Sequence, residues 1–162
     1  MPRTVMILNN PTLKVATTEA GLTSGQSVEC QVTSAAVTAS PSFVTIPATG
    51  CAGATQSPGL TGFQLDLAWL QDWQAPPPGG LSRFAFENDA RPVWFELTPD
   101  AADATTKVTG EAYAVSGAIG GTFGDGSAAT ATATWPLVNK PDVLMPVAVT
   151  TEATEGETTE AA

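Results

Sequence analysis

Four carboxylates in this chain have the residue types needed for acid–base chemistry: Asp66, Asp72, Glu87 and Glu96. A pair of Asp or Glu side chains on either side of a glycosidic bond can hydrolyse it, one as acid and the other as base or nucleophile. Asp66 falls on the polar side of an alternating segment and Glu96 stands beside aromatic residues, but nothing in the sequence brings two of the four together. We therefore expect them to face solvent or an interface, and we expect no catalytic residue.

Two tryptophans four positions apart, Trp69 and Trp73, could serve a different chemistry. Aromatic rings near the end of a strand can form a platform on which sugar rings stack. The same residues fill a core or an interface equally well, and this is the interpretation we favour. We interpret Trp94 and Trp135 in the same way.

The usual signatures of a bound phosphate or metal are incomplete. The glycine-rich stretch 120–126 is followed by no helix-forming segment, and the lysine of a phosphate-binding loop is missing. The chain has no histidine and only two cysteines, which leaves no His/Cys metal site. Asp89, Asp125 and Asp142 are single acids without the spacing of a calcium loop. We expect no cofactor and no metal.

Composition and charge exclude further classes. The 162 residues carry a net charge of −10, and no Lys or Arg lies between Lys14 and Arg83. This argues against a basic surface that binds nucleic acid, although an acidic wall can still face DNA and repel it. No apolar run approaches the roughly 20 residues that span a bilayer. We expect a soluble protein with no membrane partner.

Strand-like alternation dominates the chain. It is clearest over 63–69, where Phe63, Leu65, Leu67 and Trp69 alternate with Gln64, Asp66 and Ala68, so that the first set should face a core. Other strands are expected over 13–18, 28–38 and 93–98, with shorter apolar runs at 3–8 and 143–149.

Two other segments have different patterns. Leu81, Phe84 and Ala85 form an apolar stripe that predicts a short helix over 81–88. The segment 41–58 is rich in Pro, Ser, Thr and Gly, and it should be a long irregular loop. Loops of this length are usually functional or make contacts outside their domain.

The segment 108–137 holds two alternating runs, 108–116 and 129–135, on either side of a glycine-rich stretch. The glycines supply the backbone freedom that a chain reversal needs. We therefore predict a β-hairpin over these residues. Its side chains are small and polar, which suits a hairpin that lines a surface, such as a channel wall, or pairs with another chain.

Together these elements predict a mainly β fold, a β-sandwich or barrel-like pair of sheets with one short flanking α-helix. A single domain should occupy residues 1–149. Residues 150–162, TTEATEGETTEAA, contain four Glu and no basic residue. This composition predicts a disordered acidic tail.

In the order of its segments, the chain resembles the major tail tube protein of a siphovirus-type phage, which has a long, flexible, non-contractile tail. The resemblance covers Gly59–Leu137. Its segments are the strand and Trp pair GLTGFQLDLAWLQDW, the helix GLSRFAFEN, the strand PVWFELTPD and the glycine-rich run GAIGGTFGDGSAATATATWPL.

The resemblance implies a structural virion protein and no enzyme. Subunits of this family are β-sandwiches flanked by a helix; six form a ring whose inner sheets join around a channel, and rings stack around a tape-measure protein. It implies synthesis in the bacterial cytoplasm and a place in the virion tail. The implied partners are copies of the chain, the tape-measure protein, other tail proteins, and phage DNA that passes without sequence-specific binding. The loop 41–58 and the chain ends would bridge rings.

Two other classes compete with this one, and the second of them shares the composition. A carbohydrate-binding module or adhesin would use Trp69 and Trp73 and act as a monomer. Another virion protein, such as a capsid decoration or tail-terminator protein, would close as a trimer or a single ring. An enzyme fits the residues less well than either.

Cys30 and Cys51, the only cysteines, are expected to be reduced thiols. The start of the chain, MPRTVMILNN, lacks the apolar core and small-residue cleavage site of a signal peptide, and thiols in cytoplasm stay reduced. Alkylation without prior reduction, followed by mass spectrometry, should modify both thiols. An unalkylated chain lighter by two hydrogen atoms would instead reveal a disulfide.

Overall fold

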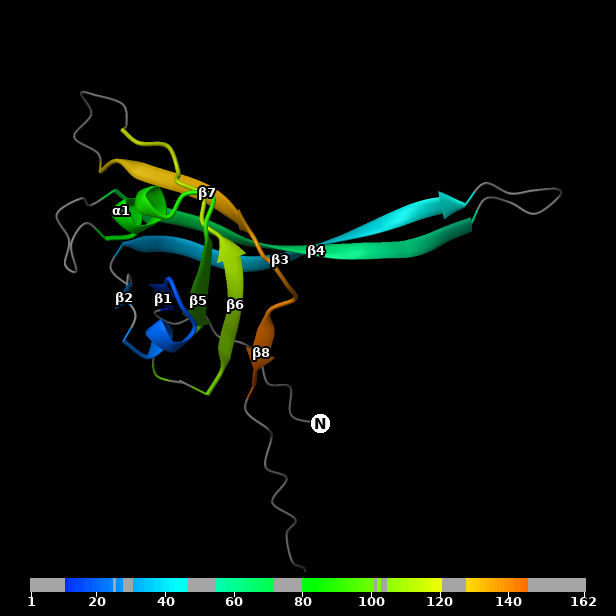
Figure 1. Ribbon diagram of the computed structural model, residues 1–162, viewed down its shortest axis with the longest axis horizontal. Helices are drawn as coiled ribbons and strands as arrows, with labels where there is room; N and C mark the ends of the chain where they lie inside the picture. Colours follow the sequence, from blue (N-terminus) through cyan, green and yellow to red (C-terminus); the bar gives the residue numbers. More distant parts are fainter. Residues whose placement is uncertain are drawn as a thin grey trace, which may run out of the picture.

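The alternation in the sequence appears in the structure as two antiparallel sheets stacked as a sandwich (Figure 1). The computed structural model describes residues 11–24, 26–27, 31–46, 55–71, 80–100, 102, 105–120 and 128–145. The two stacked sheets and the single helix confirm the predicted fold class, a mainly β sandwich with one short α-helix. Some predicted features fall outside the described residues: the run 3–8, Cys30, Cys51, Asp72, Trp73, Asp125, most of the glycine-rich stretch and the tail 150–162.

The smaller sheet has three strands in the order β3–β4–β7. They are β3 Val32–Ile46, β4 Thr55–Leu70 and β7 Thr130–Pro136. In the central strand, Leu65 pairs with Val37 on one side and with Trp135 on the other. Because side chains alternate along a strand, the odd-numbered residues of all three strands point toward the other sheet in this region.

The larger sheet has five strands in the order β2–β1–β5–β6–β8. They are β1 Thr12–Ala16, β2 Gln26–Ser27, β5 Pro92–Thr98, β6 Lys107–Tyr113 and β8 Asp142–Leu144. A 3-10 turn, η1 (Ala20–Ser24), follows β1. The strands predicted over 13–18 and 93–98 correspond to β1 and β5, and β3 takes up the second part of the strand predicted over 28–38.

The core lies between the two sheets, and it confirms the side predicted for 63–69. Leu65, Leu67 and Trp69 are buried, whereas Phe63, nearer the arm, is only partly buried. They pack with residues of the larger sheet and of β7, among them Leu13, Val15, Val93, Phe95, Ala112 and Trp135. The buried indole of Trp69 keeps a hydrogen-bond partner, because its Nε1 donates to Ser82 Oγ at 2.9 Å.

The predicted short helix is confirmed as α1 (Gly80–Glu87). Leu81 and Ala85 on its apolar stripe are fully buried. Gly80 has a φ of 56°, a backbone conformation that favours glycine. The side chain of Gln31 satisfies one free N–H at the start of the helix, because its Oε1 accepts from Leu81 N at 2.8 Å.

The irregular loop predicted over 41–58 is wrong at both ends. β3 continues through Pro41 to Ile46 and β4 begins at Thr55, so the two strands form a long two-stranded arm that projects from the sandwich (Figure 1). Proline is tolerated in a strand whose N–H side faces solvent or lies at a bulge. The arm offers both conditions: β7 pairs with β4 only over Gln64–Leu70, and the register shifts between Pro41 and Phe43.

The hairpin predicted over 108–137 is also wrong. β6 belongs to the larger sheet and β7 to the smaller one, and an isolated bridge between Ala112 and Leu137 joins the two segments. After β6 the chain crosses between sheets, where Gly117 lies so close to Trp69 and Ala131 that a Cβ would be 3.0 Å from each. Alternation identified two real strands, but it carried no information about their pairing partners. Ala131 is a core residue and lines no surface.

Leu65 provides the test of this register. Leu65→Ala should lower the free energy of unfolding by about 2–5 kcal/mol, because it leaves a cavity at a fully buried site. Urea unfolding followed by circular dichroism measures the loss. The neighbouring Gln64→Ala, on the opposite face, should cost less than ~1 kcal/mol. A silent Leu65→Ala together with a damaging Gln64→Ala would reverse the assigned faces.

Candidate functional site

The acid pair considered as an alternative in the sequence does not form between Asp66 and Glu96. Asp66 lies on the outer face of the three-stranded sheet, whereas Glu96 lies on the outer face of the five-stranded sheet, with the sandwich core between them. Glu87 is on α1, where it accepts a hydrogen bond from Arg83 Nε at 2.6 Å. Asp66 and Glu96 are therefore too far apart to act on one bond, and Glu87 is paired with Arg83.

The alternative of a tryptophan platform for sugar rings is excluded for Trp69. Its side chain is 1% exposed, so no sugar ring can stack on it. Trp135 is likewise buried, and its Nε1 donates to Val115 O at 2.8 Å. Trp94 is half-buried on the outer face of β5. The interpretation of Trp69 and Trp135 as core residues is confirmed.

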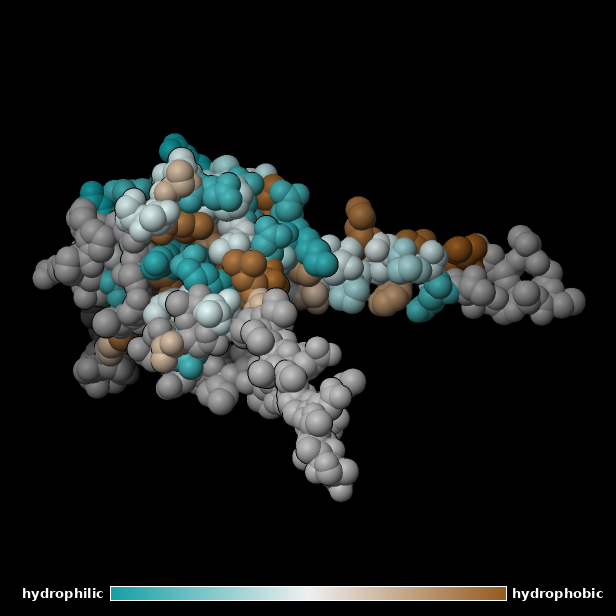
Figure 2. All heavy atoms as spheres, turned by 90° about the horizontal axis from the view of Figure 1, so that it is seen from below, coloured by the Kyte–Doolittle hydropathy of each residue, from teal (hydrophilic) through white to brown (hydrophobic). Residues whose placement is uncertain are grey.

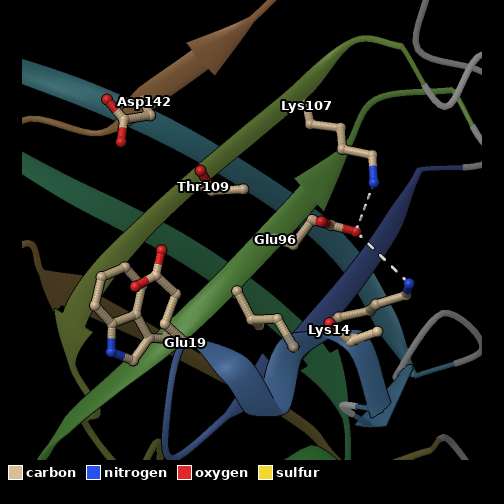
Figure 3. A pocket seen from close by; sticks show the side chains of 9 residues that line it. Lys14, Glu19, Glu96, Lys107, Thr109 and Asp142 are labelled. Carbon is tan, nitrogen blue, oxygen red and sulfur yellow. Dashed lines mark ion pairs between the residues drawn. The ribbon is translucent and has the colours of Figure 1, made fainter.

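A polar depression of about 400 Å³ lies on the outer face of the five-stranded sheet (Figure 3). At its centre, Glu96 Oε1 is 3.2 Å from Lys107 Nζ and 3.6 Å from Lys14 Nζ. Glu19 and Asp142 stand at its edges, away from this group. Both lysines already pair with Glu96, whose side chain is 15% exposed, so the depression has no free charge cluster at its centre.

The outer face of the three-stranded sheet is built from small polar side chains around one acid. Asp66 accepts hydrogen bonds from Thr38 Oγ1 and Thr134 Oγ1, both at 2.8 Å, one from each neighbouring strand. Gln64 Nε2 donates to the same carboxylate at 3.2 Å. The bond from Thr134, then that from Thr38, lowers the pKa of Asp66 below its ordinary value of 3.8. This face therefore keeps a negative charge held by neutral donors.

The arm is the most unusual surface of the molecule. Figure 2 shows hydrophobic side chains along it, far from the core. The exposed fractions are 61% for Phe43, 59% for Val44, 51% for Ile46 and 91% for Leu60. The sequence contains no charged residue between Glu29 and Asp66, although the chain carries a net charge of −10. The arm thus combines high exposure with apolar side chains and no charge.

An apolar groove of about 440 Å³ lies at the base of the arm, between the two sheets. Hydrophobic atoms also gather where the arm leaves the sandwich (Figure 2). Inner-face residues of both sheets and the segment leading into and out of β8 form most of the lining. The full set of lining residues is Ala35, Ala36, Val37, Thr38, Ala39, Phe63, Leu97, Pro99, Val108, Lys140, Pro141, Val143 and Met145. We call this feature the base groove.

The arm and the base groove contain none of the acidic, metal-binding or phosphate-binding patterns from which a site can be predicted in sequence, and neither was predicted. A signal for the arm was present, because 36 consecutive residues without charge are unusual in an acidic chain, and the run Phe43-Val44-Thr45-Ile46 favours a strand. The base groove left no such signal. It combines residues from β3, β4, β5, β6 and the segment around β8, which only the fold brings together.

The described residues contain no group of three or more Cys, Asp or Glu side chains that could hold a metal ion. Among the helices described, none has the length and apolar character needed to cross a membrane. Comparison of the chain with known protein families and with proteins of curated function gives no match. The exposed surfaces of the described residues are therefore the features that point to a function.

The lowered pKa of Asp66 predicts a pH effect with a definite sign. A carboxyl whose pKa is lower in the folded state stabilises the fold above its unfolded pKa, and this stabilisation is lost as the pH falls through the folded pKa. Thr134→Val removes the strongest donor, so the pKa of Asp66 should rise toward 3.8. Carboxyl NMR titration measures the change, and Thr132→Val, opposite Ala68 on the same strand, is the control.

Proposed function

We propose that this protein is a structural subunit of a phage tail tube, whose copies form stacked rings around a channel for DNA. The observation that carries the proposal is the arm. A two-stranded ribbon is marginally stable alone in water, and this one exposes large apolar side chains such as Phe43 and Leu60. Other protein chains would cover these side chains and stabilise the ribbon. The arm suits a subunit that works in an assembly.

The charge distribution favours copies of the same chain as the partners. Two chains with a net charge of −10 repel each other at most contacts. The arm avoids this repulsion, because no Asp, Glu, Lys or Arg lies between Glu29 and Asp66. A contact made by the arm therefore buries no charged side chain of the arm itself, which would be costly.

The outer face of the three-stranded sheet suits a channel wall. Thr38, Asp66, Thr132 and Thr134 lie on it, and its one carboxylate would repel the DNA backbone. Among the described strands, β3 and β7 form the two edges of this sheet, and in the proposed ring they pair with neighbouring copies. Pairing edge to edge around a ring would remove exposed strand edges, which otherwise promote aggregation.

The burial of Trp69 weakens one alternative function and leaves the other open. The adhesin hypothesis loses the platform residue Trp69 to the core. A capsid decoration or tail-terminator protein would also self-associate, but it would close as a trimer or as one ring. The number and arrangement of copies separate these virion proteins from a tube subunit.

Self-association through the arm is the test. Size-exclusion chromatography with light scattering, over a range of concentrations, should show assemblies of the native chain, and negative-stain electron microscopy should show rings or tubes. Val44→Lys places a charge at an exposed arm position and should shift the chain to monomer with an unchanged circular dichroism spectrum. Ala102→Lys, at an exposed position after β5, is the matched control.

Other outcomes decide between the classes. A strict monomer at every concentration, without tubes, would overturn the proposal. A closed trimer or one ring that never stacks would favour a decoration or terminator protein.

A further inference from the structure

We propose that the base groove receives the arm of a second copy of this chain. The inference rests on the proposed self-association, and it names the surface that accepts the arm. The base groove is where the inner face of the three-stranded sheet loses its cover. Along β3, Ala35 and Val37 are partly buried against the core, whereas Ala39, on the same face, is exposed.

An apolar sheet face of this kind is normally covered by another element. Leu97 and Val108 of the five-stranded sheet form the opposite wall of the base groove, and Val143 and Met145 flank it with exposed fractions of 48% and 61%. The charged side chain among its lining residues is Lys140. Because the rest of the lining is uncharged and mostly apolar, the missing cover should be mainly apolar.

The arm of the same molecule cannot supply this cover. β3 and β4 continue from the groove into the arm without reversing direction, and the arm points away from the sandwich (Figure 1). Phe43 lies four residues beyond Ala39, which in an extended strand is roughly 13 Å further out. The arm of another copy has no such restriction.

The chemistry of the arm matches that of the base groove. Phe43, Val44 and Ile46 offer exposed apolar side chains, and the whole segment between Glu29 and Asp66 is uncharged. The acidic segment 150–162, with four Glu and no basic residue, matches an apolar lining poorly. Residues 5–8, Val-Met-Ile-Leu, are the competing occupant within the chain, and the experiment distinguishes them from the arm.

Arm and base groove are different surfaces of one subunit, so their contact is heterologous. Such a contact passes from copy to copy and gives rings or open stacks, unless two copies exchange arms and close as a dimer. The stacks of the proposed tube use the first arrangement. The groove contact itself is common to both, so the groove can be tested independently of tube formation.

Cross-linking between two differently labelled chains tests the contact. Both chains carry Cys30→Ser and Cys51→Ser; one adds Val44→Cys on the arm and the other Val143→Cys at the base groove. Oxidation of the mixture should give a disulfide-linked heterodimer about tenfold more abundant than a mixture of Val44→Cys with Ala102→Cys gives. Equal yields, or no cross-link in either mixture, would overturn the proposal.

Thiol accessibility separates the arm from the chain's own residues 5–8. Val143→Cys should react with a maleimide quickly in dilute monomer and about tenfold more slowly in assemblies, while Ala102→Cys reacts equally in both. If Val143→Cys is equally slow in dilute monomer, the chain covers its own groove and the proposal fails.

Filling the base groove with a larger side chain is the complementary experiment, since it leaves the native cysteines and the exposed arm residues Phe43–Ile46 unchanged. Ala39→Trp should weaken self-association by about tenfold, and Ala102→Trp should not. Microscopy then distinguishes this inference from the proposed function. Cross-linked chains without tubes would support the groove and contradict the tube; tubes without the cross-link would do the reverse.

Discussion

The pairing of β3 with β4 is the interaction on which the rest of the structure depends. The same two strands carry Leu65, Leu67 and Trp69 into the core and then continue outward as the arm. Because side chains alternate, a slip of one residue would move every core side chain to the outer face. The register that fixes the core therefore also fixes the direction of the arm and the position of the base groove beneath it.

Local patterns were enough to predict the fold class and several elements. The alternation over 63–69 and 93–98 and the apolar stripe over 81–88 each depend on neighbours within one segment, and the structure confirms all three. Pairing between distant segments was not accessible in this way. The runs 108–116 and 129–135 look like one hairpin, yet burial of Trp69 and Trp135 between the sheets places β6 and β7 in different layers.

The arm shows why proline content misled the prediction. Pro41 and Pro58 interrupt a strand only where a neighbouring strand needs their missing N–H, and each strand of the described part of the arm has a neighbour on one side only.

Asp66 and Glu96 show that the prediction of functional sites from the sequence has a similar limit. Residue type identified them as acids, but their positions on opposite faces of the sandwich follow from pairing that spans the whole chain. A function spread over surfaces leaves no compact motif.

Charge and apolar surface have separate places in this molecule. On the five-stranded sheet Glu96 is neutralised by Lys14 and Lys107, and on the three-stranded sheet Asp66 remains charged, with hydroxyl and amide donors in place of a cation. Repulsion between acidic bodies reaches about 8 Å at physiological ionic strength. The uncharged arm extends further than this from the sandwich. Contact between two such bodies through the arm would therefore meet little repulsion, while charge would keep their other faces apart. In the proposed assembly, the acidic composition and the charge-free segment would together select which surfaces of two copies meet.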